Sequence, residues 1–535
     1  MTPLFLTIFL HSFASLSNSL PLSASSRWIT DDQSGERVKL ACASWAGHLE
    51  PMLPEGLDRR PLSQIATHVS TMGFNCVRLT WATYMFTRYA NMTVAQSFRG
   101  LGLTDAISGL ASRNPNLLRL NLVDAWKAVV KEIGRHGIMM VLDNHVSKPM
   151  WCCADQDGNG FFRSVYFDPD EWLQGLAIVA NIFKDTPMVV GMSLRNELRG
   201  PLQNVDVWYK YVEKGAKTIN TANPNLLVII SGLSYDLDFR FLKQRPLKLK
   251  TMKKKKVVYE AHRYSFNEGQ SKVWMGGPLN KVCHDITREM EEKAGFLVRG
   301  GKDDAAPLFV SEFGIDQMGE SEADNRHLPC MLSHLADLDL DWSVWALQGS
   351  YYLREGQYGP DETYGMFNTN WTALRNPNFH SKLEFLQQKL QDPKSSGPTY
   401  HLLYHPLSGR CAQVVNDQIH MSDCLGASQC IQEADGMPIQ MIQSLKCLTV
   451  VGEDLPLGLS TICNDRQSNT WSLASNSSMS FQLANRGDNG VVLCLDFDSS
   501  YSSSTILTRK CVGLEEGDMR NPQTQWFKLI ASNKK

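Results

Sequence analysis

Residues 189–197 read VVGMSLRNE and residues 307–314 read PLFVSEFG, two apolar runs that each reach a glutamate near their end. Strands that are buried on both faces read as continuous apolar runs, so both stretches are predicted to be strands of a parallel sheet. A carboxylate at the end of such a strand is costly to bury unless it is paired or functional. Glu197 and Glu312 are therefore candidate functional residues.

Six further apolar runs accompany these two, and helical patterns alternate with all eight. The other predicted strands are residues 38–47, 75–81, 138–145, 226–232, 257–264 and 341–347. Amphipathic stretches between the strands are residues 62–72, 120–136, 171–183, 207–221, 279–294 and 323–337. Strands that alternate with helices indicate parallel βα units. Eight such units predict an α/β domain over residues 27–391, folded as a (β/α)8 TIM barrel.

Polar side chains stand at the C-terminal ends of these strands, where the active sites of barrels lie. They are Arg78, His145, Asn196, Glu197, His262, Tyr264, Glu312 and Trp345. Glycoside hydrolysis requires two carboxyl groups, one to protonate the leaving oxygen and one to attack the anomeric carbon or activate water. Arg78 would keep a nucleophile ionised, whereas the acid needs a raised pKa. A structural ion pair is the alternative for either glutamate taken alone.

The sequence changes character after residues 392–399, a polar segment with Pro, Gly and Ser that is predicted to be a linker. Helical periodicity gives way to short strands and turn residues. A repeat of about 40–45 residues becomes visible, with units that begin near residues 408, 444 and 491. Three repeats that cannot bury a core alone predict an all-β trefoil domain over residues 400–535.

The N-terminus, residues 1–26, is predicted to be a secretory signal peptide. An apolar run over residues 4–10 leads into small residues, with cleavage expected between Ser19 and Ser26. An uncleaved apolar extension is the alternative. Thirteen cysteines and glycosylation sequons at Asn91, Asn370 and Asn476 also favour an oxidising, extracellular destination.

Other classes of function receive no support from the sequence. A net charge of −2 gives no field that would attract nucleic acid, and no further apolar run is long enough for a membrane span. The run DQDGNG at 155–160 resembles part of a calcium loop but lacks the glutamate expected at its twelfth position. The two histidines of HLLYH, 401–405, fall in a predicted strand and do not share a helix face for zinc. No metal or cofactor is predicted, and the oligomeric state stays open.

Several of these segments together resemble glycoside hydrolase family 5, the cellulase and mannanase superfamily, and most of all its plant members. The matching segments are residues 73–81, 141–147, 191–200, 259–266 and 309–314, with the strand of Trp345. The resemblance implies a retaining enzyme with Glu197 as acid/base and Glu312 as nucleophile. It further implies that Asn196 holds the sugar 2-hydroxyl, that Trp345 stacks under a sugar ring, and that the remaining strand-end residues support the glutamates. The loop at 148–162, with Trp151, is expected to shape the sugar cleft.

The C-terminal repeats resemble a ricin B-type lectin. That resemblance implies disulfides Cys411–Cys424, Cys447–Cys463 and Cys494–Cys511, and leaves Cys430 unpaired. The sugar-binding aspartate expected after the first cysteine of a repeat is present only as Asp496; Gln413 and Thr449 stand at the corresponding positions. Sugar binding is therefore expected in the third repeat at most, and a purely structural domain is the alternative.

We thus expect a secreted retaining β-glycosidase that acts on a carbohydrate substrate, located in the cell wall or apoplast if the source is a plant. β-1,4-Glucan, β-mannan and small β-glucosides are all compatible with the sequence as substrates. Two rivals stay open: a transglycosylase that uses the same carboxyl groups, and a catalytically silent carbohydrate-binding protein.

Overall fold

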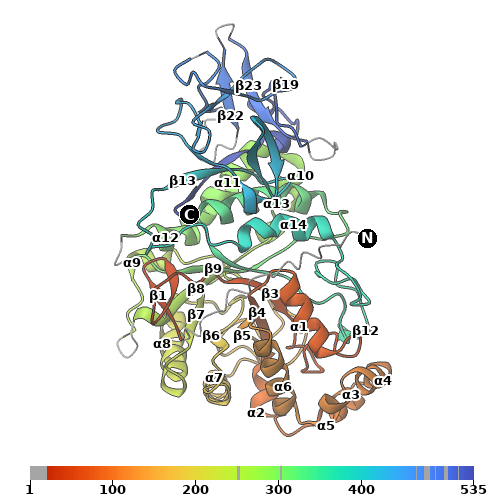
Figure 1. Ribbon diagram of the computed structural model, residues 1–535. Coiled ribbons are helices and arrows are strands. Elements are labelled where there is room, and N and C mark those ends of the chain that lie inside the picture. Colours follow the sequence, from red (N-terminus) through yellow and green to blue (C-terminus); the bar gives the residue numbers. More distant parts are fainter. Residues whose placement is uncertain are drawn as a thin grey trace, which may run out of the picture.

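The structure is a computed structural model that describes residues 21–249, 254–301, 304–465, 467–474, 482–487, 490–498, 504–515 and 517–534. Most of the predicted leader therefore lies outside the described residues. Figure 1 shows a barrel in the larger, N-terminal part of the chain and a region of short strands, drawn in blue, at its C-terminal end. Among the described residues, none of the helices combines the length and apolarity needed to cross a membrane.

Eight parallel strands close into a barrel in the order β10-β3-β4-β5-β6-β7-β8-β9. Their bounds are β3 Ala41–Trp45, β4 Cys76–Ala82, β5 Met139–Val146, β6 Val189–Ser193, β7 Leu227–Ser231, β8 Val257–Arg263, β9 Leu308–Phe313 and β10 Asp341–Val344. Each lies within or overlaps one of the eight predicted strands, so the predicted (β/α)8 barrel is confirmed. Because all eight strands run the same way, their carboxyl ends meet at one mouth of the barrel.

Helices surround the barrel. The larger ones are α1 Leu62–Thr71, α6 Leu122–Arg135, α7 Pro169–Ile182, α8 Val205–Ala222, α11 Leu279–Met290, α13 Glu322–Asp337 and α14 Pro377–Gln387. The remaining helices, of which α4 is as long as α1, are α2 Thr83–Thr87, α3 Val94–Gly100, α4 Thr104–Arg113, α5 Pro115–Arg119, α9 Phe241–Gln244, α10 Ser271–Gly276 and α12 Phe296–Arg299. Single turns are η1 Lys254–Lys256, η2 Asn267–Gly269, η3 Glu291–Gly295, η4 Cys424–Gly426 and η5 Gln523–Gln525.

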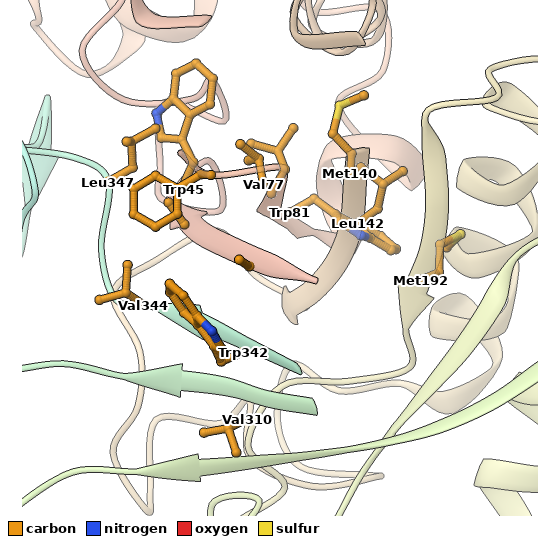
Figure 2. Close-up of a cluster of buried hydrophobic side chains, with 14 of the residues drawn as sticks. Trp45, Val77, Trp81, Met140, Leu142, Met192, Val310, Trp342, Val344 and Leu347 are labelled. Carbon is orange, nitrogen blue, oxygen red and sulfur yellow. The ribbon is translucent and has the colours of Figure 1, made fainter. Parts of the chain in front are cut away.

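The main core lies between the barrel wall and these helices. Figure 2 shows Trp342 and Val344 of β10 beside Val310 of β9 in this layer. The Trp342 indole N–H donates to the Leu386 carbonyl of α14 at 2.9 Å, so its polar edge is satisfied although the ring is fully buried. Fully burying an apolar side chain stabilises the fold by about 1.5–3 kcal/mol. Such residues, repeated around the ring, hold the mouth of the barrel in a fixed shape.

A hairpin that the sequence did not indicate precedes the barrel. β1 Leu22–Ser25 pairs antiparallel with β2 Trp28–Asp31. Leu22 is 1% exposed, and the Lys256 ammonium group donates to its carbonyl at 2.5 Å. The expected domain boundary at residue 26 falls inside this hairpin. Of the cleavage positions open in the sequence, those before Leu22 leave the hairpin whole.

The C-terminal region is built of short antiparallel strands, in agreement with the predicted all-β character. One sheet holds β13 Tyr400–His405, β14 Arg410–Val415, β15 Gln418–Ser422, β16 Gln429–Ile431, β17 Gln440–Met441, β18 Cys447–Thr449, β20 Gly458–Ser460 and β25 Lys528–Ser532. A second holds β19 Leu455–Pro456, β21 Ser472–Leu473, β22 Leu483–Arg486, β23 Val492–Asp496 and β24 Leu507–Lys510. The trefoil arrangement of these strands stays a prediction.

Disulfide bonds cross-link both the barrel and the C-terminal region. In the C-terminal region the three predicted pairs are present: Cys411–Cys424, Cys447–Cys463 and Cys494–Cys511. Cys430 is a free, buried thiol. In the barrel, where the sequence left the pairing open, the bonds are Cys42–Cys76, Cys152–Cys153 and Cys283–Cys330. The first joins neighbouring strands β3 and β4, and the last joins α11 to α13.

The C-terminal region packs directly on the barrel. The Trp526 ring is fully buried among α10, α11 and α13, and its N–H donates to Asn280 on α11 at 2.8 Å. Tyr404 of β13 stacks on Phe385 of α14, with ring centroids 4.5 Å apart. Figure 1 shows β13 lying beside these helices. The expected linker is also fixed to the C-terminal segment, because Asp392 and Asn533 exchange hydrogen bonds.

Candidate active site

A pocket of about 630 Å³ opens at the carboxyl-end mouth of the barrel and contains both candidate glutamates. Its described lining also includes His145, Tyr264 and Trp345 among the residues predicted from the sequence. Arg78, Asn196 and His262 lie behind this lining, where they contact the glutamates or each other. The volume is typical of small-molecule sites, which range from about 300 to 1,000 Å³.

Glu312 lies on β9 and is 5% exposed. Its Oε1 accepts from the Arg78 guanidinium at 2.6 Å, and its Oε2 accepts from the Tyr264 hydroxyl at 2.9 Å. Burial raises the pKa of this carboxyl group, whereas the neighbouring His262 and Arg78 act on the pKa in the opposite direction. Two fixed donors on one carboxylate orient it and favour its charged form.

Arg78 is fully buried beneath Glu312 and touches two further carboxyl groups. Asp143 lies 3.1 Å and Glu260 lies 3.8 Å from its guanidinium. Burial alone would lower the pKa of Arg78, but the surrounding carboxylates raise it above its ordinary value. The cation beside the Glu312 carboxylate is therefore permanent over any working pH.

Glu197 stands just beyond β6, on a backbone with φ of 43°, in the left-handed region that a residue with a side chain rarely adopts. Its N–H donates to the Asp236 carboxylate at 3.0 Å, which holds this unusual turn. Its Oε1 lies 2.9 Å from Nδ1 of His262. Burial raises the pKa of Glu197 to about 7. A carboxyl group with that pKa carries its proton in mildly acidic solution, as a general acid must.

The two glutamates face each other across the pocket. One carboxylate oxygen of Glu197 and one of Glu312 lie within 4.8 Å of each other, and Nδ1 of His262 lies 2.9 Å from Glu197 and 3.7 Å from Glu312. Carboxyl groups about 5–5.5 Å apart are typical of retaining glycosidases, whereas inverting enzymes need about 6.5–9.5 Å to fit a water molecule. The spacing allows one carboxyl group to attack a sugar ring while the other protonates the leaving oxygen.

The other predicted residues form the surroundings of this pair. The Asn196 side-chain oxygen accepts from Arg78 at 2.8 Å. The His145 ring lies 2.6 Å from Asp143 through Nδ1 and stacks on Trp345, with centroids 5.6 Å apart. Burial lowers the pKa of His145 well below its ordinary value, so the ring is neutral. The contact of Trp345 with a sugar ring stays a prediction.

The sequence analysis missed Asp143, Asp236 and Glu260, which support the site from below and behind. Asp143 and Glu260 are buried charges inside the apolar strands β5 and β8. This is the same signal that drew attention to Glu197 and Glu312, so it could have found them. Asp236 follows β7 on a loop, where one carboxylate carries no such signal.

In the described residues, the side chains that could bind a metal ion already have partners within the protein. Glu197, His262 and Glu312 form one group, and His145, Cys152 and Cys153 form another. The two sulfurs of the second group are joined to each other, so they are not thiolate ligands. In the run at 155–160, Asp155 accepts from Tyr235 and Asp157 pairs with Arg199.

Asp496, the expected lectin residue, is 5% exposed. Its carboxylate accepts hydrogen bonds from Arg509 at 3.2 Å and from Thr524 at 3.3 Å. These hydrogen bonds fix the end of β23 and leave the Asp496 carboxylate little capacity to bind a sugar. They therefore favour the alternative of a purely structural domain. Asn91 and Asn370 are exposed in turns, and Asn476 lies outside the described residues.

Comparison with known proteins agrees with this geometry. Residues 32–350 match the family model described as cellulase (glycosyl hydrolase family 5). A "Glycosyl hydrolase 5 family protein" of Chamaecyparis obtusa is 43% identical over 97% of this chain and 95% of its own. An "Endoglucanase" of Paenibacillus polymyxa is 21% identical over 65% of this chain and 82% of its own. The catalytic domain of the major endoglucanase of Xanthomonas campestris pv. campestris superposes with a TM-score of 0.56 at 20% identity, covering 68% of this chain and 99% of that one.

A (β/α)8 barrel with a facing pair of carboxyl groups at its carboxyl-end mouth, together with the match to the family model, defines an O-glycosyl hydrolase that binds a carbohydrate substrate. The chain belongs to glycosyl hydrolase family 5, which confirms the resemblance seen in the sequence.

Proposed function

We propose that the protein is a retaining hydrolase of β-linked glucan, with Glu312 as the nucleophile and Glu197 as the acid/base. The observation that carries this proposal is the separation of their carboxylate oxygens, within 4.8 Å. Glucan is the first substrate to test because the Paenibacillus polymyxa relative is named an endoglucanase. β-Mannan and small β-glucosides are the alternatives.

In the first step an oxygen of Glu312 attacks the anomeric carbon, while protonated Glu197 gives its proton to the departing glycosidic oxygen. The product is a glycosyl ester on Glu312. In the second step Glu197, now ionised, takes a proton from water as the water attacks the same carbon and releases Glu312. Arg78 and Tyr264 stabilise the Glu312 carboxylate at 2.6 and 2.9 Å each time it is set free.

The test is to incubate the purified protein with a panel of β-glucans and β-mannans and to follow the first-formed anomer by NMR. Release of the β anomer is expected, and release of the α anomer contradicts a retaining mechanism. Glu312→Ala should abolish turnover, and azide should restore part of it by forming the α-glycosyl azide. If the variant keeps more than a few per cent of wild-type activity without azide, Glu312 is not the nucleophile.

The same reaction can end in transfer to a sugar acceptor instead of water, which is the rival activity. The described residues that line the pocket do not distinguish a sugar acceptor from water, so product analysis at high oligosaccharide concentration separates the two activities. A catalytically silent sugar-binding protein is the other rival, and turnover of an activated aryl glycoside contradicts it.

We further propose that the protein is secreted as a glycoprotein and that its C-terminal region is a ricin B-like trefoil. The leader pattern over residues 1–26, the disulfides and the exposed sequons at Asn91 and Asn370 support secretion. The repeat of cysteine pairs supports the trefoil. Endoglycosidase treatment of the secreted protein, read as a mass shift, tests the first part.

A further inference from the structure

A disulfide bond between adjacent residues, Cys152 and Cys153, lines the pocket that contains the two glutamates. It belongs to the loop that follows β5, and neither step of the proposed reaction uses it. Cys152 is 9% exposed and Cys153 is partly exposed, whereas the four cysteines of the other two barrel disulfides are each at most 1% exposed. Among the described disulfides of the barrel, the Cys152–Cys153 bond is therefore the one that a small reagent can reach from the pocket.

This bond contributes little to the stability of the whole fold. In the chain-entropy model, the stabilisation by a disulfide grows with the length of the loop that it closes. The sequence separation is 1 for Cys152–Cys153, against 34 and 47 for the other two barrel disulfides. Breaking the bond between neighbours should therefore leave the barrel folded and change only what the two sulfurs contact.

The two sulfurs contact the side chain of Asn196, the residue directly before Glu197. The Asn196 amide nitrogen donates to Sγ of Cys152 at 3.8 Å and to Sγ of Cys153 at 3.6 Å. Its amide oxygen accepts from Arg78 at 2.8 Å. Each sulfur is a weak acceptor, but two of them on one side and a guanidinium group on the other fix the direction in which the amide faces. Asn196 is the residue expected to hold the sugar 2-hydroxyl, so its orientation bears on turnover.

A second contact links the same loop to the backbone of Glu197. Arg199 donates to the Ala154 carbonyl at 3.1 Å and to the Glu197 carbonyl at 2.7 Å. Ala154 directly follows Cys153, and Arg199 is 1% exposed. A displacement of the loop at Cys153 therefore reaches both the amide beside the acid and the turn that carries the acid.

We propose that the Cys152–Cys153 pair is a redox modification site that controls the activity of the enzyme, with a dithiol as the reductant. One thiolate of the dithiol attacks a sulfur of the pair and breaks the S–S bond, and its second thiolate then displaces that sulfur. The two cysteines gain the two hydrogens of the dithiol, which is oxidised to its own disulfide. Because two thiols cannot stay at bonding distance, at least one sulfur moves away from Asn196. The bonded form is the active form, and the reduced form is less active.

This inference goes beyond the proposed glycosidase activity and rests on it for its readout. The test compares the full-length enzyme on a β-linked oligosaccharide before and after mild treatment with dithiothreitol, a dithiol. The value of kcat should fall about tenfold, the loss expected for one positioned hydrogen bond. KM should change less, because hydrogen bonds to the 2-hydroxyl strengthen in the transition state. The melting temperature should stay near that of the untreated enzyme, and oxidised glutathione should restore kcat.

Labelling and variants identify the pair that responds. Iodoacetamide, followed by peptide mapping, should alkylate Cys152 and Cys153 only after reduction. The double variant Cys152→Ser/Cys153→Ser should have the low kcat of the reduced wild type and should not respond to dithiothreitol, although it keeps the five other disulfides. The matched control, Cys447→Ala/Cys463→Ala, removes a disulfide of the C-terminal region and should respond as the wild type does.

An unchanged kcat in wild type with both cysteines reduced overturns the proposal. A pair that resists alkylation, a double serine variant that still responds to dithiothreitol, or a loss of activity that follows a fall in melting temperature does the same. These results leave the proposed function standing as long as the oxidised enzyme hydrolyses a β-glycoside. An oxidised enzyme that hydrolyses none overturns the proposed function, and its redox control with it.

Discussion

At the scale of single residues, the decisive contrast is between two buried glutamates with different neighbours. Glu312 has the permanent cation of Arg78 at 2.6 Å, whereas Glu197 has the ring of His262 at 2.9 Å. Burial lowers the pKa of His262 and so disfavours its charged form beside Glu197. One carboxyl group is thereby favoured as an anion and the other as an acid, which is the division of roles that the reaction requires.

Replacement of the acid tests this division directly. Glu197→Gln should slow substrates with poor leaving groups far more than activated aryl glycosides, because only the former need a proton. Such catalysis is worth roughly 10²–10⁴-fold. The measurement is kcat/KM over a series of aryl glycosides with different leaving-group pKa values. Equal losses across the series would show that Glu197 is not the acid.

The pH dependence of activity follows from the same residue. Burial raises the pKa of Glu197 to about 7, so the proton that it must donate is present below pH 7 and is lost as the pH rises through about 7. Glu312 must be ionised, so activity also falls in acid. We expect a bell-shaped profile of kcat/KM with its alkaline limb near pH 7, measured on an oligosaccharide. In Glu197→Gln, assayed on an activated aryl glycoside, that alkaline limb should disappear.

At the scale of elements, the short C-terminal strands depend on their disulfides. The bond between Cys447 at the start of β18 and Cys463 closes a loop with a sequence separation of 16 residues. Closing a loop of about 15 residues stabilises a fold by roughly 3 kcal/mol in the chain-entropy model. Replacement of both cysteines by alanine should lower the free energy of unfolding of this region by about that amount, measured by urea denaturation. Activity on a small glycoside should persist, because the pocket lies in the other part of the chain. A stability equal to that of the wild type would contradict the prediction.

At the scale of the whole molecule, the C-terminal region acts as part of the barrel's packing. Tyr400, Leu402 and Tyr404 of β13 belong to the same buried cluster as the barrel core. The buried Trp526 fills a space among the barrel helices next to Trp274. We therefore expect deletion of residues 400–535 to lower the melting temperature of the barrel and its yield. A truncated barrel as stable as the full chain would instead support an independent sugar-binding module.

Substitution of Asn280, on α11, tests the interface between the C-terminal region and the barrel without a deletion. It accepts from the Trp526 N–H at 2.8 Å and donates to the Gln482 side chain and the Gly513 carbonyl, each at 2.7 Å. Asn280→Ala leaves buried polar partners unsatisfied and should destabilise the protein by about 1–3 kcal/mol. Lys281→Ala, at the next position and 64% exposed, is the control and should change stability little. Thermal unfolding of both variants gives the comparison, and equal effects would argue against a structural interface.

Much of the barrel could be predicted from local patterns alone. Each strand is a short apolar run, and His145 and Glu312 stand near the ends of their runs, so their positions along the chain predict their place at the mouth. Arg78 was expected at the end of its strand as well, but it is the third residue of β4 and lies buried beneath Glu312. The hairpin β1–β2 escaped prediction because its first strand falls inside the stretch that was interpreted as a leader. Asp236 escaped because a single carboxylate on a loop has no local pattern to distinguish it.

The sequence by itself determined the fold class and the identity of the two facing glutamates as candidates, because periodicity is a local property of a chain. The cysteine pairs of the C-terminal repeats followed from their resemblance to a ricin B-type lectin. Only the tertiary structure decided what surrounds each of these groups. It placed Asp236 behind Glu197, set the Cys152–Cys153 bond beside Asn196, and enclosed Asp496 between Arg509 and Thr524. These contacts join residues from separate loops and strands, and burial and charge acquire their effect on pKa and binding only once such residues have been brought together in space.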